Sequence, residues 1–255
     1  MKTNTFLSVI SMLVLFVIAC GGDKKHDKVV AFEDEFYTIA PADVSKEDAQ
    51  AMVTEYITYA DTYPEDSMTP VFLDKAATVS IDYLEASQAA NLYKRLKLNY
   101  PEYAPTAQLI EMRVDTLEDR LFSGASGSID KTRAKQLLNT YVTYYYLFPE
   151  DSLTPEYLFR AADMSMNLFS AGKSISLFNK VLEDYPDYRK APQCLFLKAF
   201  VYENNLNDLD NAKKYYAEFI EKYPDDDFAD DAQMSLKNLG KTPEELIREF
   251  EAANQ

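Results

Sequence analysis

A triplet of an aromatic residue, a proline and an acidic residue recurs five times, and it constrains the fold more than any other feature of the chain. The copies are Tyr63-Pro64-Glu65, Tyr100-Pro101-Glu102, Phe148-Pro149-Glu150, Tyr185-Pro186-Asp187 and Tyr223-Pro224-Asp225. Their prolines lie 37, 48, 37 and 38 residues apart. A period in the thirties is typical of stacked helical pairs, because one pair is too small to bury its own apolar face. We therefore expect an all-α solenoid, which favours a scaffold that binds partners over a catalytic pocket.

Large side chains precede each proline at helical spacing. The aromatic residues eight positions before the prolines are Tyr56, Tyr93, Tyr141, Phe178 and Tyr216. Together with the aromatic residue of the triplet they mark one stripe of an α-helix. The proline ends that helix, because it lacks an N–H and forces the preceding residue out of helical geometry. We assign the stripe to the core rather than to a sugar-binding platform, because each repeat needs large side chains against its neighbour.

A second period of 85 residues overlies the first. Residues 56–121 align without gaps on residues 141–206, and the segment 64–70 differs from 149–155 only at Met68 and Leu153. We interpret this as a duplicated module of four helices and expect both copies to share one fold. An insert at 122–129 explains the irregular interval, and its glycines predict a flexible joint.

The first twenty residues resemble the signal of a bacterial lipoprotein. Lys2 supplies a positive charge, and residues 6–18 form a mostly apolar run that is shorter than the ~20 residues of a spanning helix. The small residues before Cys20 resemble a lipobox, which implies cleavage before Cys20 and its acylation with fatty acids such as palmitate. The alternatives are an ordinary secretory signal with an incidental cysteine and a retained membrane anchor.

The remaining reactive side chains do not suggest catalysis. If Cys20 carries lipid, Cys194 has no partner in the chain for a disulfide. Cys194 lies in an apolar segment, where it reads as a small buried hydrophobe. A catalytic thiol would need a nearby base, and the only histidine, His26, lies in the polar segment after the anchor. We therefore expect no catalytic residue, no enzymatic activity and no cofactor.

An acidic run at 225–231 could suggest calcium. An EF-hand loop needs glycine at its sixth position and glutamate at its twelfth, whereas this chain has Asp230 and Leu236 there. We interpret the run as a solvated helix start and expect no metal site.

The net charge of the chain limits the kinds of partner. It is -16 at pH 7, and such a field repels nucleic acid and anionic lipid headgroups. This negative charge favours partners with a basic face, and the resemblance to a lipoprotein implies envelope proteins or peptides. The lipid on Cys20 would provide the contact with the membrane.

The sequence predicts a tether followed by eleven helices. Residues 20–45 hold the lipidated cysteine and a flexible tether, although Val29 to Phe32 and Phe36-Tyr37 are apolar enough to dock on the first helices. Ser45 with Asp48 forms a capping box, and Thr242, Pro243 and Glu245 start the last helix. The expected helices span 46–62, 69–84, 86–99, 105–121, 130–147, 154–169, 171–184, 191–205, 208–222, 227–239 and 242–253.

The helices that end at the prolines resemble the second helix of a tetratricopeptide repeat (TPR). In that pattern a small residue, an aromatic residue four positions later and a proline recur, and Ala89, Tyr93 and Pro101 match it. The matching set in the last repeat is Ala212, Tyr216 and Pro224. The resemblance implies a right-handed α-solenoid of TPR-like helix pairs. It also implies that the helices after each proline line an inner face where a partner binds.

The plan of the chain resembles TPR outer-membrane lipoproteins, namely BamD-like lipoproteins of Bacteroidota. The parts are a signal peptide (1–19), the lipidated cysteine and tether (20–45), a first TPR-like module (46–121), the insert (122–129), a second module with a further repeat (130–239) and a C-terminal capping helix (240–255).

This resemblance implies a membrane-anchored scaffold for protein–protein interactions in the bacterial cell envelope. Its place would be the periplasmic side of the outer membrane, with outer-membrane protein assembly as a candidate process. The alternative is a glycan- or nutrient-binding lipoprotein built on the same frame. The sequence identifies no partner-binding residue.

Overall fold

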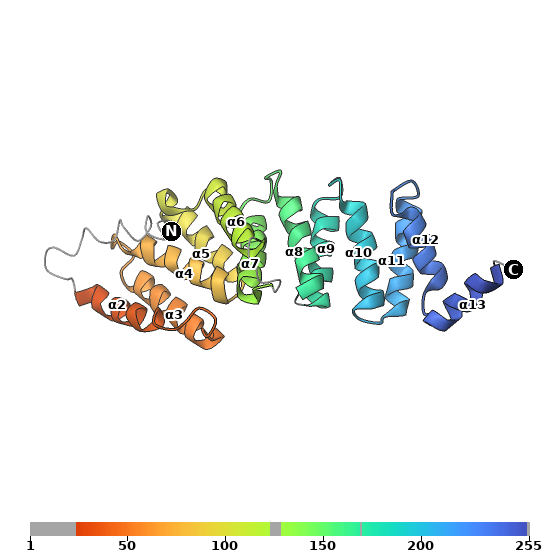
Figure 1. Ribbon diagram of the computed structural model, residues 1–255. Helices are drawn as coiled ribbons and strands as arrows, with labels where there is room; N and C mark the ends of the chain where they lie inside the picture. Colours follow the sequence, from red (N-terminus) through yellow and green to blue (C-terminus); the bar gives the residue numbers. More distant parts are fainter. Residues whose placement is uncertain (1–23, 123–128, 169, 254–255) are drawn as a thin grey trace, which may run out of the picture.

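The computed structural model describes residues 24–122, 129–168 and 170–253, and within these ranges it is an elongated stack of helices without strands (Figure 1). The stack is a TPR-like helical solenoid in which most consecutive helices pack on one another. Its helices are α2 (Lys24–Phe36), α3 (Lys46–Thr62), α4 (Thr69–Tyr83), α5 (Ala86–Asn99), the 3-10 turn η2 (Pro101–Tyr103), α6 (Ala107–Phe122), α7 (Lys131–Leu147), α8 (Thr154–Leu168), α9 (Ala171–Asp184), α10 (Ala191–Asn204), α11 (Leu209–Lys222), α12 (Ala229–Asn238) and α13 (Pro243–Ala253).

The eleven helices predicted from residue 46 onward are all present, and each begins and ends within two residues of its expected bounds. The predicted capping box also forms: the Asp48 amide donates to Ser45 Oγ at 3.0 Å, and the Ser45 amide donates to Asp48 Oδ2 at 3.2 Å. Local signals set these bounds, because caps and prolines act within a few residues.

The five triplets form five equivalent corners. The aromatic residue of each triplet is the C-cap of a helix, with φ between -143° and -129°, and its amide still donates to the carbonyl four residues earlier. The backbone thus leaves helical geometry at the residue before proline, with ψ between 57° and 63°, because the proline ring disfavours the helical conformation there.

The predicted aromatic stripe is core. Tyr56, Phe178 and Tyr216 are fully buried, and Tyr93 is 5% exposed. Each of these rings packs between helices, so the interpretation of the stripe as a packing element is confirmed.

The prediction of a flexible tether is wrong for residues 24–36, which form α2. Val29 and Phe36 lie seven positions apart on one side of this helix, and both are buried. The predicted docking of this apolar segment is therefore correct for Val29 and Phe36, whereas Tyr37 is 61% exposed. Burial of these two large side chains holds the segment on α3. The free energy of this burial offsets the conformational entropy that the segment loses when it becomes ordered.

Helix α2 corresponds to α6 at the 85-residue offset of the duplication. Val29 matches Val114, and Glu33 matches Glu118. The described residues therefore contain five helix pairs, each ending in a triplet: α2–α3, α4–α5, α6–α7, α8–α9 and α10–α11. The duplicated unit is one helix longer at its start than the sequence alignment indicates.

The two modules differ at their fourth helix. In the second module α10 packs along α9, whereas α6 packs on α7 and makes little contact with α5. Instead, α7 packs on both α4 and α5. The Asn139 side-chain amide donates to the carbonyls of Ile81 and Leu84 at 2.9 and 3.1 Å, and Lys135 Nζ donates to the Tyr83 carbonyl at 2.8 Å. These bonds cap the end of α4 with side chains of α7, which joins the modules.

Helix α13 starts as predicted, but it leaves the large apolar side chain of Ile247 exposed. Gly240 has φ 77°, and the Thr242 and Glu245 side chains accept from each other's amides. However, Ile247 is 58% exposed, and α13 lies apart from the other helices at the end of the stack (Figure 1). The Lys241–Glu249 ion pair, at 2.7 Å, holds α13 against its own turn instead.

Candidate functional site

The lipidation site expected at Cys20 lies outside the described residues, as do most residues of the insert. The second cysteine, Cys194, is fully buried on α10. Burial raises the pKa of its thiol to about 12, although nearby Lys190 acts in the opposite direction. The thiol is therefore protonated at neutral pH and is not a nucleophile.

The single histidine belongs to the first helix pair. His26 lies on α2 with Nε2 3.3 Å from Asp66 Oδ1, and its ring packs against Tyr59 and Phe72. This contact pins α2 to the corner between α3 and α4.

The acidic run at 225–231 forms the corner before α12 and the first residues of that helix. Asp226 Oδ1 accepts a hydrogen bond from the Phe228 amide at 3.0 Å. At equivalent corners, Asp66 accepts from the Met68 amide and Asp151 accepts from the Leu153 amide in the same way. Among the described residues no three His, Cys, Asp or Glu side chains are placed to hold a metal ion. Within the same part of the chain no helix has the length and apolar character needed to cross a membrane.

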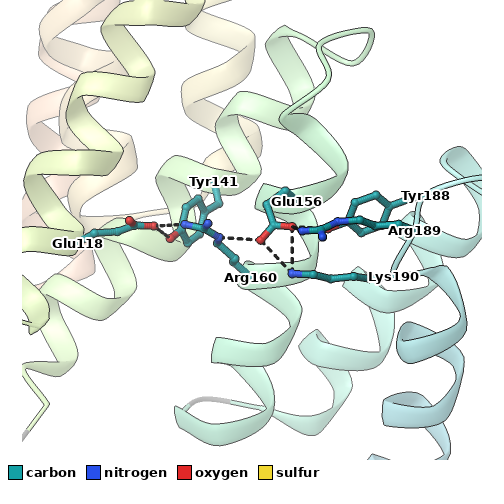
Figure 2. A network of polar contacts seen from close by, with 7 residues as sticks. All are labelled: Glu118, Tyr141, Glu156, Arg160, Tyr188, Arg189 and Lys190. Carbon is teal, nitrogen blue, oxygen red and sulfur yellow. Dashed lines mark hydrogen bonds and ion pairs between the residues drawn. The ribbon is translucent and has the colours of Figure 1, made fainter. Parts of the chain in front are cut away.

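A chain of polar side chains runs along the stack through the second module, and we call it the polar ladder (Figure 2). It connects α6, α7, α8 and the corner before α10. Its members are Glu118, Tyr141, Glu156, Arg160, Tyr188, Arg189 and Lys190. Arg160 lies at its centre, because Nη1 contacts Glu118 Oε1 at 2.6 Å and Nε contacts Glu156 Oε1 at 3.0 Å.

Hydrogen-bond donors and cations surround the Glu156 carboxylate at one end of the ladder. The Tyr188 hydroxyl and Lys190 Nζ donate to it, and Arg189 Nη2 lies 3.7 Å away. Burial alone would raise the pKa of this carboxyl, but the bonds from Tyr188, Lys190 and Arg160 outweigh burial and lower the pKa to about 2. Glu156 is thus ionised at neutral pH, and its negative charge orders three cations on the surface.

Only part of the ladder is duplicated. In the first module Glu33 accepts the Tyr56 hydroxyl and Lys75 Nζ, both at 2.6 Å, and these three residues match Glu118, Tyr141 and Arg160 at offset 85. The position that matches Glu156 is Val71. The ladder of the second module therefore extends further, to Glu156 and the cations around it. One of these cations is Arg189, whose side chain is 77% exposed.

A shallow depression of about 680 Å³ lies at the corner between α7 and α8, beside the end of α9. Its main lining residues are Tyr145, Tyr146, Pro149, Glu150, Asp184 and Tyr185. Sequence reasoning missed both this depression and the ladder, because it followed only the stripe residues that the two modules share.

Two comparisons bear on the class of protein. The family model described as Tetratricopeptide repeat matches residues 193–226, which span α10, α11 and the corner after them. No curated protein matches the chain.

The matched repeat and the stack of helix pairs are consistent with one class of fold, a TPR-like helical solenoid. Repeats of this kind generally mediate protein–protein interactions, since a solenoid offers an extended surface rather than a closed pocket. The geometry agrees with that use: the ladder and the depression expose charged and aromatic side chains along a rigid frame.

Proposed function

We propose that the protein is a lipid-anchored scaffold of the bacterial cell envelope that binds protein partners along its solenoid. The observation that carries this proposal is the polar ladder, which lies across consecutive repeats and includes residues of helices that follow the triplet prolines. Partners with basic faces suit the net charge of -16. Assembly of outer-membrane proteins is the process we favour, by analogy of plan with BamD-like lipoproteins.

The anchor is supported by the sequence around Cys20. Cys20→Ser should release the protein from the membrane fraction, because each buried CH₂ of an acyl chain contributes ~0.8 kcal/mol and several chains hold the protein almost irreversibly. Fractionation after a high-salt wash measures this. A Ser variant that stays with the membrane would contradict the lipoprotein assignment.

The periplasmic orientation has its own test. Gly21 and Gly22 follow Cys20, so no acidic cluster stands directly after the lipid. We expect protease added to whole cells to leave the protein intact and to degrade it once the outer membrane is opened. Degradation in whole cells would place the protein on the outer surface.

The scaffold function can be tested by photo-crosslinking in cells. A photoreactive residue in place of Arg189, whose side chain is 77% exposed, should form adducts with defined envelope proteins, identified by mass spectrometry. Leu98 on α5 is 82% exposed and away from the ladder, so it is the matched control position. Equal adducts at both positions would contradict binding at the ladder.

The glycan- or nutrient-binding alternative receives less support. Its natural platform is the aromatic stripe, and Tyr56, Tyr93, Phe178 and Tyr216 are buried. A sugar could not stack on these rings without opening the core.

A further inference from the structure

The duplication supplies an internal comparison for the depression between α7, α8 and α9. Six of its lining residues recur in the first module; they are Pro149, Glu150, Asp151, Ser152, Pro155 and Tyr185, which match Pro64, Glu65, Asp66, Ser67, Pro70 and Tyr100. The tyrosine plays the same role in both modules. Tyr100 donates to the Pro64 carbonyl at 2.5 Å, and Tyr185 donates to the Pro149 carbonyl at 2.9 Å. The two corners are therefore built in the same way.

The three lining residues that differ between the modules form a connected group. Tyr145, Tyr146 and Asp184 stand where the first module has Ala60, Asp61 and Asn99. The Tyr145 hydroxyl donates to Asp184 Oδ2 at 2.8 Å, and the rings of Tyr145 and Tyr146 lie 5.0 Å apart. Because the first module forms the same corner without this group, the corner does not require it.

The chemistry of these three residues favours a cationic ligand. Lys180 Nζ lies 5.0 Å from the Tyr145 ring centre, and Lys94 Nζ lies 5.9 Å from that of Tyr146, so both rings already attract ammonium groups. The carboxylates of Glu150, Asp151 and Asp184 also line the depression. The Tyr145 and Tyr146 rings are inclined at 53°, which makes a wedge rather than the flat platform on which a sugar ring stacks.

The shape of the depression favours an extended peptide segment as its ligand. The depression is open to solvent, and about 680 Å³ falls within the ~300–1,000 Å³ typical of ligand sites. Shallow surfaces lined by aromatic side chains bind polyproline II segments, whose rings fit between aromatic rings at little cost in entropy.

We propose that this depression binds an extended basic segment of a partner protein in which arginine or lysine alternates with proline. The prolines contact Tyr145, Tyr146 and Tyr185, and the cations face Glu150 and Asp184. This inference rests on the proposed scaffold function and specifies the chemistry of one partner.

The test uses the full chain in detergent and a labelled eight-residue peptide of alternating proline and arginine, followed by fluorescence anisotropy. The double variant Tyr145→Ala/Tyr146→Asp introduces the residues of the first module, where Asp61 pairs with Arg95 at 2.8 Å. The aspartate introduced at position 146 can pair with Lys180, which matches Arg95 at offset 85, and circular dichroism checks that the variant remains folded. We expect the peptide to bind at least about 10-fold more weakly. If charge alone attracted the peptide, the added carboxylate would make binding tighter, and that result would overturn the inference.

A matched pair of charge reversals tests whether the peptide binds at this depression. Glu150→Lys should weaken binding of the peptide, whereas Glu65→Lys, at the equivalent corner of the first module, should not. Equal effects of the two reversals would overturn the inference, as would equal binding of a proline–glutamate peptide.

Two further outcomes separate this inference from its alternatives. Loss of oligosaccharide binding in the double variant, with peptide binding retained, would make the depression a glycan site. If envelope proteins still crosslink at Arg189 while the double variant binds the peptide as before, the scaffold function holds and only this inference fails.

Discussion

The hydroxyl of Tyr56 on α3 donates a hydrogen bond of 2.6 Å to the carboxylate of Glu33 on α2. The same pair recurs as Tyr141 and Glu118 on α7 and α6. In the last pair, Tyr216 on α11 donates to Glu203 on α10 at 2.8 Å. A buried ring thus presents its hydroxyl to a carboxylate of the first helix in three of the five pairs, and this contact makes α2 part of the solenoid.

Glu33→Ala should destabilise the protein by about 1–3 kcal/mol, because it removes the carboxylate that accepts the hydrogen bond of the buried Tyr56 hydroxyl. It also removes the ion pair with Lys75. Urea unfolding measures the loss, and hydrogen exchange should show faster opening of residues 24–36. Glu35→Ala, at an exposed position of the same helix, is the control and should change stability by no more than about 0.5 kcal/mol. Unchanged exchange in α2 would contradict this role of Glu33.

Tyr93→Ala and Phe178→Ala should each destabilise the protein by about 3–5 kcal/mol, as the loss of buried aromatic side chains does. Circular dichroism during urea unfolding gives the values. Leu98→Ala, on the same helix as Tyr93 but 82% exposed, is the control. An unchanged melting temperature together with lost oligosaccharide binding would favour the glycan-binding alternative.

Asn139→Ala should cost about 1–3 kcal/mol, since the carbonyls of Ile81 and Leu84 lose a donor inside the junction. Protection of the end of α4 against hydrogen exchange should fall as well. The matched control is Thr54→Ala, because Thr54 occupies the equivalent place in the first module and is exposed. Equal effects of the two substitutions would mean that Asn139 does not join the modules.

We expect the stability of the protein to depend on pH because of the buried carboxyl of Asp74. Burial raises its pKa to about 6, although Arg113 and Tyr93 act in the opposite direction. The folded state therefore keeps a proton that the unfolded chain releases above about pH 4. This contribution to stability is present below about pH 4 and is lost as the pH rises through about 6.

Asp74→Asn should remove that dependence, so the difference in stability between variant and wild type should change by up to about 2–3 kcal/mol from pH 4 to pH 7. Urea unfolding at a series of pH values measures it. Asp187→Asn, at an exposed corner, controls for the loss of one charge. A constant difference across this range would contradict the assignment to Asp74.

The repeat could be predicted from the sequence because its signals are local. A proline acts on the residues next to it, and an amphipathic stripe repeats every helical turn. These signals located the eleven helices from residue 46, the corners at the triplets and the buried stripe. The match of Glu33 and Val29 to Glu118 and Val114 at offset 85 was also present in the sequence. It could have revealed α2, but the polar residues between them conceal the helical period.

The relationships between helices were decided only by the tertiary structure. Whether α6 packs on α5 or on α7 depends on the sum of many side-chain contacts between distant residues, and no local spacing encodes that sum. The capping of α4 by Asn139, the order of cations around Glu156 and the wedge of Tyr145 and Tyr146 all follow from that packing. The sequence by itself therefore determined the repeated unit, and the packing of the repeats determined which side chains meet at their surfaces.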